Sequence, residues 1–559
     1  MFARFRSSRF SFSRIALPKR LRRPVLFLFA AALAAHAAGA AEYQFGVTLP
    51  PSTVNPSLYA ASHFFLYIPP QTPRVRAVLW APANIIERRL CDDPALRAEA
   101  ARDGIAIVFF QAGWRKDFFN SPDLVRYLQT AADELATRSG YSEIATAPWI
   151  PIGHSGNSQF VQGVDRQAPA RVVAGIVIKG AVPAVGPDGS TSGLEGIPLL
   201  TFTGEYEEVM PPGKVRNGWW PVTVQRFLDV RQAVPHALFS CMLDRDHGHV
   251  GWDDRMTGYL TLFLHKAIAA RLSSGGALRP VSFESGWLGD PTETFATAPV
   301  SRYKGDPGKA FWFFDEEQAR AWESLFRRDE HKQDQMLAFL QDGKAADWWN
   351  GWALQGIRFD PLPDGESFRV QAVPRQAIPE PFSDAGRPLG HNTAAKIQYK
   401  VVGWASQTLQ TGADTFRVAF DREGVNGRTT HILIGASLAG NETYKDATAV
   451  ATLDVPTSNT EGLPQTIDFP PLADIAPATA TVALHAVTNT HRRVDYYVSY
   501  GPAQIVDGIL QLTPIPVRAK FPIEVSVTAY QWGTASGERF QTAKPVTRTF
   551  LIQDHKSRP

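Results

Sequence analysis

Cysteine is almost absent from this chain of 559 residues, which contains only Cys91 and Cys241. Two thiols cannot form a disulfide framework, so a hydrophobic core must hold the fold together. The pair could form one disulfide in an oxidising compartment or remain as buried free thiols, and the sequence leaves both open. Long apolar runs are also scarce. Beyond residue 41, no stretch is long and apolar enough to cross a bilayer as a helix.

The first 41 residues differ in composition from the rest of the chain. They hold eight Arg and Lys residues and no acidic residue, followed by the apolar run Val25–Phe29 and an Ala-rich stretch ending around Ala38–Ala40. This order predicts a secretory signal peptide at residues 1–41. A membrane anchor is the alternative, but the apolar run is short for a span. We therefore expect export to the periplasm, the cell surface or the medium.

Acidic residues outnumber Lys and Arg once this leader is set aside. The whole chain has a formal charge of +3, and removal of the eight leader cations leaves a net charge of −5. A negative balance argues against a nucleic-acid partner. The second half of the chain shows no metal-ligand cluster and no Gly-rich phosphate loop. We expect no cofactor and no metal.

Strand-like and helix-like stretches alternate between residues 60 and 275. The expected strands are His63–Pro69, Val75–Ala81, Ile105–Phe110, Trp149–Ile152, Val173–Ile178, Leu199–Thr203 and Ala237–Leu243. The expected helices are Pro94–Asp103, Ser121–Ser139, Asn157–Gln167, Val222–Ala233 and Arg255–Leu272, because apolar residues recur at spacings of three and four. Such alternation predicts a parallel α/β sheet, in which active sites form at the carboxyl ends of the strands.

One of these strand ends carries a candidate nucleophile. The apolar strand runs into Gly153-His154-Ser155-Gly156-Asn157, and a helix-like stretch follows. This strand, turn and helix have the form of a nucleophile elbow with Ser155 at its tip. Asn157 stands where a second glycine is usual, although Asn tolerates tight turns better than most residues. His154 is expected to help pack the turn.

Acids and histidines follow two later strands. The strand Leu199–Thr203 is followed by Gly204-Glu205-Tyr206-Glu207-Glu208, and the strand ending at Leu243 is followed by Asp244-Arg245-Asp246-His247-Gly248-His249. The chain order serine, acid, histidine resembles that of the α/β-hydrolases, over residues 60–275. The resemblance implies that the serine attacks a carbonyl, the histidine takes its proton and the acid orients the histidine.

The resemblance also indicates which acid and which histidine take part. Glu207 stands three residues after Gly204, as in the Gly-x-x-Asp turn of the family, with Glu205 and Glu208 as alternatives. His249 precedes Val250-Gly251-Trp252-Asp253, similar to a His-x-x-Trp-Asp/Ser element of some secreted bacterial esterase-like proteins. His247 is interpreted as a supporting or substrate-facing residue, or as simply exposed.

The resemblance further implies two donors for the oxyanion of the tetrahedral intermediate. One is the amide of Gly156, directly after the serine. The family often has His-Gly in the loop after the strand at residues 75–80, but this chain has Ala-Pro-Ala-Asn there. Since Pro82 cannot donate, the amides of Ala83 or Asn84 are left, with the Asn84 side chain as a possible helper.

Three tryptophans are candidates for substrate contact. Trp219 and Trp220 follow the acid turn, and Trp114 follows another expected strand. Exposed tryptophans can stack on sugar or phenolic rings, but all three could equally be packing residues.

The second half of the chain has a different pattern. Residues 276–350 are interpreted as an accessory segment with a polar helix at Glu316–Asp342. Short strand-like stretches separated by turns follow from residue 351, which favours one or two immunoglobulin-like β-sandwiches in 351–559. The expected strands are Ser367–Ala372, Ile397–Val402, Thr415–Phe420, His431–Ser437, Thr448–Leu453, Thr479–Val487, Val494–Ser499, Ile523–Ala529 and Val546–Ile552.

Together these patterns predict an exported serine hydrolase, with its catalytic domain at 42–275, that cleaves carboxylic esters through an acyl-enzyme. The predicted export, the tryptophans and the β appendage favour one substrate class, namely acyl groups on polysaccharides, such as acetyl or feruloyl esters. A peptidase and a polyester or lipid hydrolase remain open. The missing His-Gly and the Asn157 departure favour another class, a glycan-binding surface protein with a degenerate hydrolase fold.

Overall fold

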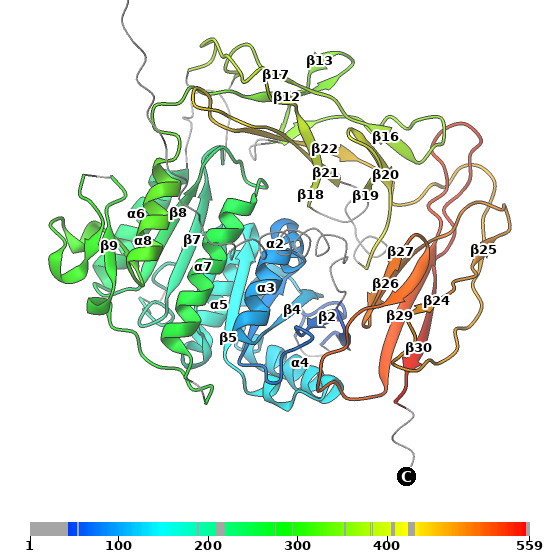
Figure 1. Cartoon of the computed structure of the whole chain (residues 1–559), viewed down its shortest axis with the longest axis horizontal. Helices are drawn as coiled ribbons and strands as arrows, with labels where there is room; N and C mark the ends of the chain where they lie inside the picture. Colours follow the sequence, from blue (N-terminus) through cyan, green and yellow to red (C-terminus); the bar gives the residue numbers. More distant parts are fainter. Residues whose placement is uncertain are drawn as a thin grey trace, which may run out of the picture. The chain divides into compact units, whose positions relative to one another are not determined.

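The central sheet has eight strands in the order β1-β2-β4-β3-β5-β6-β7-β8 (Figure 1). The computed structural model describes residues 43–554 except 53–54, 187–188, 208–218, 274, 293, 351–353, 381, 383, 404–407 and 423–430. The strands are β1 (Phe45–Leu49), β2 (Ser62–Tyr67), β3 (Ala77–Pro82), β4 (Ile105–Gln111), β5 (Trp149–His154), β6 (Gly175–Ile178), β7 (Leu199–Gly204) and β8 (Phe239–Asp244). The predicted signal peptide at 1–41 lies outside the described residues.

Six helices connect or flank these strands. They are α2 (Ile85–Cys91), α3 (Pro94–Asp103), α4 (Leu124–Ser139), α5 (Ser158–Gln167), α6 (Trp219–Ala233) and α7 (Asp254–Arg271). β2 is antiparallel to β1 and β4, and every other neighbouring pair in the sheet is parallel. Strands β3 and β5 to β8 are buried along their whole length, as expected of strands covered by helices. The parallel α/β prediction is confirmed, and the sheet fits an α/β-hydrolase domain.

Two elements of this domain were not predicted. β1 pairs with β2 at the edge of the sheet, and α2 follows directly on β3. The helix α2 has only seven residues, and its apolar Ile85 and Ile86 continue the apolar run of β3. Sequence periodicity cannot identify so short a helix. Its N-cap is Asn84, whose side chain accepts a hydrogen bond from the Ile85 amide.

The predicted helix Glu316–Asp342 is wrong in its second half. The helix α8 (Glu316–Arg327) ends early, and β12 (Leu337–Gln341) pairs with β17 (Ala372–Pro374). His331 lies between them with a left-handed backbone (φ 73°), which a continuous helix cannot contain. Before α8, the strands β9 (Trp287–Gly289), β10 (Ala298–Pro299) and β11 (Phe311–Phe313) form a small sheet.

Short and mostly antiparallel strands make up the rest of the chain. They are β13 (Lys344–Ala345), β14 (Trp348–Asn350), β15 (Leu354–Gly356), β16 (Ser367–Arg369), β18 (Gln398–Gly403), β19 (Thr408–Gln410), β20 (Thr415–Val418), β21 (His431–Leu438), β22 (Ala447–Asp454), β23 (Ile467–Asp468), β24 (Thr481–Val482), β25 (Val487–Thr488), β26 (Asp495–Tyr500), β27 (Ala503–Val506), β28 (Ile509–Leu512), β29 (Ile523–Tyr530) and β30 (Val546–Ile552). The largest sheet has the order β14-β15-β22-β21-β18. These sheets are consistent with a β-sandwich, and the immunoglobulin-like assignment stays a prediction. The strand expected at Thr479–Val487 is instead two separate short strands, β24 and β25, in different sheets.

Both cysteines are buried free thiols, which decides between the two alternatives left by the sequence. Burial raises the pKa of the Cys91 and Cys241 thiols well above the ordinary value, so both stay protonated and unreactive.

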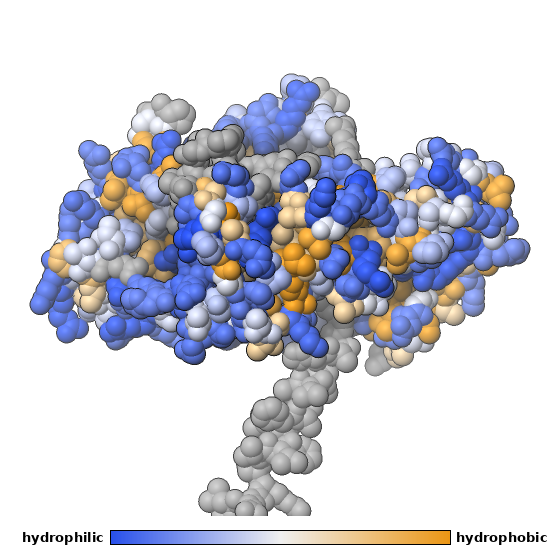
Figure 2. All heavy atoms as spheres, turned by 90° about the horizontal axis from the view of Figure 1, so that it is seen from above, coloured by the Kyte–Doolittle hydropathy of each residue, from blue (hydrophilic) through white to orange (hydrophobic). Residues whose placement is uncertain are grey.

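The face shown in Figure 2 is mostly hydrophilic, with hydrophobic residues in small groups. No helix within the described residues has the length and apolar character needed to span a membrane. Residues Glu42–Pro559 form one compact unit, so the boundaries at 275 and 350 remain predictions.

Candidate active site

Ser155 sits in a strained turn at the carboxyl end of β5. Its backbone is left-handed, with φ of 54°, and α5 begins three residues later. A Cβ atom on Gly153 would lie 2.2 Å from the carbonyl oxygen of Asn157. The turn therefore requires glycine at position 153. This geometry matches the strained turn that the sequence predicts for a nucleophile elbow.

Asn157, the departure from the usual motif, ties the elbow to the segment after β3. Its backbone is right-handed (φ −75°), so a glycine is not needed there. The side-chain amide donates to the Pro82 carbonyl at 3.1 Å and to the Glu87 carboxylate at 3.0 Å. Glu87, buried on α2, also accepts the backbone amide of His154 at 2.6 Å. The asparagine thus contributes hydrogen bonds that a glycine could not make.

Three side chains from separate strand ends form a hydrogen-bonded chain. His249 Nε2 lies 2.8 Å from Ser155 Oγ, and His249 Nδ1 lies 2.7 Å from Glu207 Oε1. The second Glu207 oxygen accepts the Gly204 amide at 2.7 Å, which fixes the carboxylate at the end of β7. A carboxylate at Nδ1 favours the tautomer whose Nε2 can accept the serine proton. The arrangement is suited to activating the hydroxyl.

Glu205, the other candidate acid among the described residues, does not join this chain. Glu205 accepts the Asp246 amide at 3.0 Å and pairs with Arg245 at 3.4 Å, so its carboxylate supports the histidine loop instead. Glu208 lies outside the described residues. Of the acids that can be compared, the geometry favours Glu207.

We expect Glu207→Gln to lower kcat/KM for an ester by about 10³–10⁴-fold. The glutamine NH₂ group would face His249 Nδ1 and favour the tautomer that cannot accept the serine proton. Glu205→Gln is the matched control, with an expected loss below about tenfold. Steady-state rates of both folded variants check this, and a larger loss for Glu205→Gln would contradict it.

His154 holds the backbone of His249. Its Nε2 lies 2.9 Å from the His249 carbonyl oxygen, and the two rings are 4.8 Å apart. Burial holds the pKa of His154 well below its usual range, and the neighbouring His249 lowers it further. The ring is therefore neutral and donates from Nε2. In addition to its predicted packing role, His154 therefore makes a specific hydrogen bond to the backbone of His249.

The sequence analysis missed Lys179, a fully buried lysine that follows β6 with a left-handed backbone (φ 45°). Its ammonium donates to the carbonyl oxygens of Gly248 at 2.8 Å and Gly251 at 2.5 Å, on either side of His249. It also pairs with Asp244 at 2.7 Å. A lysine directly after the apolar stretch 173–178 was the available signal, since a buried lysine needs a partner.

His247 is buried rather than exposed. Its Nδ1 lies 2.8 Å from Asp244 Oδ1. Burial alone would raise the pKa of Asp244, but His247 and Lys179 hold it below the ordinary value. His247 also borders a cavity of about 440 Å³ whose wall includes Trp252 and residues of β18, β21 and β22. Its predicted substrate contact remains a prediction.

The oxyanion prediction for Ala83 needs correction. Its amide donates to the Phe110 carbonyl at 2.7 Å, as a continuation of the β3–β4 pairing, and cannot serve a substrate. The Asn84 side chain is also engaged, because its amide donates to the His154 carbonyl at 3.0 Å. The backbone amides of Gly156 and Asn84 make no hydrogen bond with any residue in the described ranges. They remain the candidate donors.

Two of the three tryptophans are packing residues. Trp114 is buried against Phe118 and Tyr127, with ring centroids 5.0 and 5.6 Å apart. Trp220 packs against Phe311 and Phe326, so substrate contact through its ring is not supported. Trp219 is 37% exposed at the start of α6, and its substrate role stays a prediction.

Residues beyond position 275 contact the acid and histidine loops. Thr448 on β22 donates to the Asp246 carbonyl, and Arg328 pairs with Asp246. Tyr206, between the candidate acids, packs edge-on against Phe382. The C-terminal part of the chain therefore buttresses the loops that carry Glu207 and His249.

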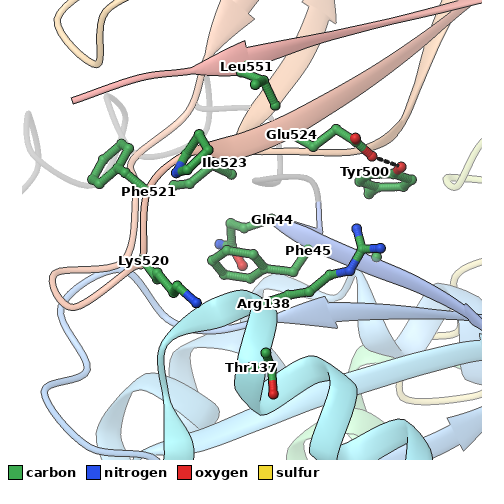
Figure 3. Close-up of a pocket in the computed structure, with 12 residues that line it drawn as sticks. Gln44, Phe45, Thr137, Arg138, Tyr500, Lys520, Phe521, Ile523, Glu524 and Leu551 are labelled. Atoms are coloured by element: carbon green, nitrogen blue, oxygen red, sulfur yellow. Dashed lines mark hydrogen bonds between the residues drawn. The ribbon is translucent and has the colours of Figure 1, made fainter. Parts of the chain in front are cut away.

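Two other features lie apart from the Ser155 site. Glu99, Asp103 and His265 have oxygen and nitrogen atoms within 4.8 Å of one another and could hold a cation. His265 Nδ1 already lies 3.3 Å from Glu99 and 3.1 Å from Asp103, so these side chains form a polar link between α3 and α7. A hollow beside β1 and β29, lined in part by Arg138 and Glu524, contains none of the predicted site residues (Figure 3).

No family model and no curated protein matches the chain. A poly(3-hydroxybutyrate) depolymerase from Bordetella parapertussis is similar in structure at 12% identity, covering 43% of this chain and 92% of its own, with a TM-score of 0.29. An S-formylglutathione hydrolase from Agrobacterium tumefaciens shows 12% identity, 42% and 96% coverage and a TM-score of 0.28. A siderophore hydrolase from Aspergillus nidulans shows 10% identity, covers 41% of this chain and 96% of its own, and has a TM-score of 0.29. Likenesses of this size do not bear on the activity of this chain.

Proposed function

We propose that this chain is a serine hydrolase of the α/β-hydrolase type that cleaves carboxylic esters through an acyl-enzyme. The observation that carries the proposal is the continuous chain from Ser155 Oγ through His249 to Glu207, with contacts of 2.8 and 2.7 Å. Buried polar side chains can have structural roles, but a serine in a strained turn, bonded to a histidine that a carboxylate orients, matches the requirements of nucleophilic catalysis.

The reaction follows from these positions. Ser155 Oγ attacks the ester carbonyl while His249 Nε2 takes its proton, and Glu207 stabilises the imidazolium. The oxyanion accepts hydrogen bonds from the Gly156 amide and from a second donor, the Asn84 amide. His249 then gives the proton to the leaving alcohol, which leaves an acyl group on Ser155. Water, deprotonated by His249, attacks the acyl carbonyl, the bond between Ser155 Oγ and the acyl group breaks to release the acid, and His249 returns the proton to Ser155 Oγ.

The proposal includes export, because residues 1–41 have the charged, apolar and small-residue order of a secretory signal peptide. Acyl esters on polysaccharides, such as acetyl or feruloyl groups, are the first substrates to examine. A panel of chromogenic esters of differing acyl length, including a feruloyl ester, would rank these candidate substrates by kcat/KM.

A fluorophosphonate probe tests the proposed nucleophile. The folded protein should be labelled, and Ser155→Ala should reduce labelling by at least about 10³-fold, because the variant lacks the hydroxyl that is hydrogen-bonded to His249. Heat-denatured protein and Ser142→Ala, a change at an exposed serine, are the controls. Absence of labelling in the folded protein, or labelling that survives Ser155→Ala, would overturn the proposal.

A further inference from the structure

A short helix beside the elbow places a positively charged side chain, that of Lys116, next to Gly156, the residue after Ser155. The 3₁₀ helix η1 (Lys116–Asn120) follows β4 and packs against α5. A Cβ atom on Gly163 of α5 would lie 2.2 Å from the Phe119 carbonyl oxygen, so the two backbones touch. The rings of Phe119 and Phe160 also pack together, 5.9 Å apart. The position of η1 relative to the elbow helix is therefore set by close packing.

The residues before η1 are anchored just as firmly. The Arg115 amide donates to the Ser57 carbonyl at 2.8 Å, and the Gly113 carbonyl accepts the Ala60 amide at 3.0 Å. Trp114 is held in the aromatic cluster with Phe118. These contacts fix the backbone from which the Lys116 side chain extends.

The Lys116 ammonium reaches the residue that directly follows Ser155. A Cβ atom on Gly156 would lie 2.3 Å from Lys116 Nζ. Lys116 is exposed and forms no ion pair or hydrogen bond with the part of the chain that the structure describes. The adjacent Asp117 does not form an ion pair with Lys116, and its carboxylate accepts a hydrogen bond from Ser57 Oγ at 2.7 Å instead. A positive charge with no ion-pair partner among the described residues thus lies beside Gly156, the residue that directly follows Ser155.

We propose that Lys116 is a specificity residue that binds a negatively charged group of the substrate next to the scissile ester. This inference rests on the proposed function and adds the substrate class: esters with a carboxylate or similar anion in the acyl or the alcohol part. An ammonium is a compact charge with three donors and suits such an anion without demanding one geometry. A neutral ester gains no such contact.

The test compares esters that differ in charge. Mono-4-nitrophenyl succinate carries the anion in the acyl part, 3-carboxy-4-nitrophenyl butyrate carries it in the alcohol part, and 4-nitrophenyl butyrate is neutral. Lys116→Met should lower the ratio of kcat/KM for one anionic ester over the neutral ester by about two- to fivefold, the size expected of one exposed charge pair. Comparing this ratio between variants cancels the intrinsic reactivity of the esters. The preference should also weaken as salt increases.

Arg115→Met is the matched control, because it removes one exposed positive charge from the same loop. An equal fall in the ratio for both variants would overturn the assignment to Lys116. An unchanged ratio in Lys116→Met, or equal losses for anionic and neutral esters, would overturn the anion-binding role as well. Failure of the wild-type protein to hydrolyse any ester or to bind the fluorophosphonate probe would instead overturn the proposed function.

Discussion

His249→Ala is expected to lower kcat/KM for an ester by about 10⁴–10⁶-fold, whereas His247→Ala should cost less than about a hundredfold. The difference follows from position. His249 Nε2 is 2.8 Å from Ser155 Oγ, while the His247 ring bonds to Asp244. Only the first change removes the group that takes the serine proton. Initial rates with a chromogenic ester, on protein whose circular dichroism matches the wild type, check the prediction.

The pair of histidine variants is informative because both residues lie in one loop and both are buried. A general disturbance of the loop would affect the two variants alike. Equal losses, or a larger loss in His247→Ala, would contradict the assignment of His249 as the base.

Lys179→Met is expected to lower the free energy of unfolding by about 3–5 kcal/mol. Methionine fills a similar volume, but it leaves Asp244 with one partner fewer and leaves the carbonyls of Gly248 and Gly251 without their shared donor. Buried polar groups without partners are costly. Urea denaturation measures the loss, and Lys309→Met, a change at an exposed lysine, should change stability by less than about 0.5 kcal/mol.

A double variant separates the ion pair from the carbonyl contacts. Lys179→Met combined with Asp244→Asn removes both charges. The double variant should therefore lower the free energy of unfolding by less than the sum of the two single-variant losses. Strict additivity of the two changes would contradict the view that the charges compensate each other.

Local patterns explain which parts of the fold could be predicted. Apolar runs and helical spacing identified the parallel strands and the helix Pro94–Asp103, because covered strands and amphipathic helices leave their mark in adjacent residues. The same reasoning extended α8 by fifteen residues, because the polar stretch after Arg327 contains no proline or glycine before Gly343 to mark the end. The pairing of β12 with β17, some thirty residues away, could not be read locally.

Local residue patterns were enough to identify most strands and helices of the central sheet, the turn that carries Ser155 and a short set of acids and histidines at neighbouring strand ends. Contacts between distant parts of the chain settled the rest: they placed Glu207 rather than Glu205 on His249, used the Ala83 amide in the sheet, buried Trp114 and set Lys179 behind the histidine loop. The physical reason is that each of these outcomes is a choice of hydrogen-bond or packing partner between residues distant along the chain. Periodicity and motifs report neighbours in sequence, whereas partners are selected when the sheet brings its strand ends together.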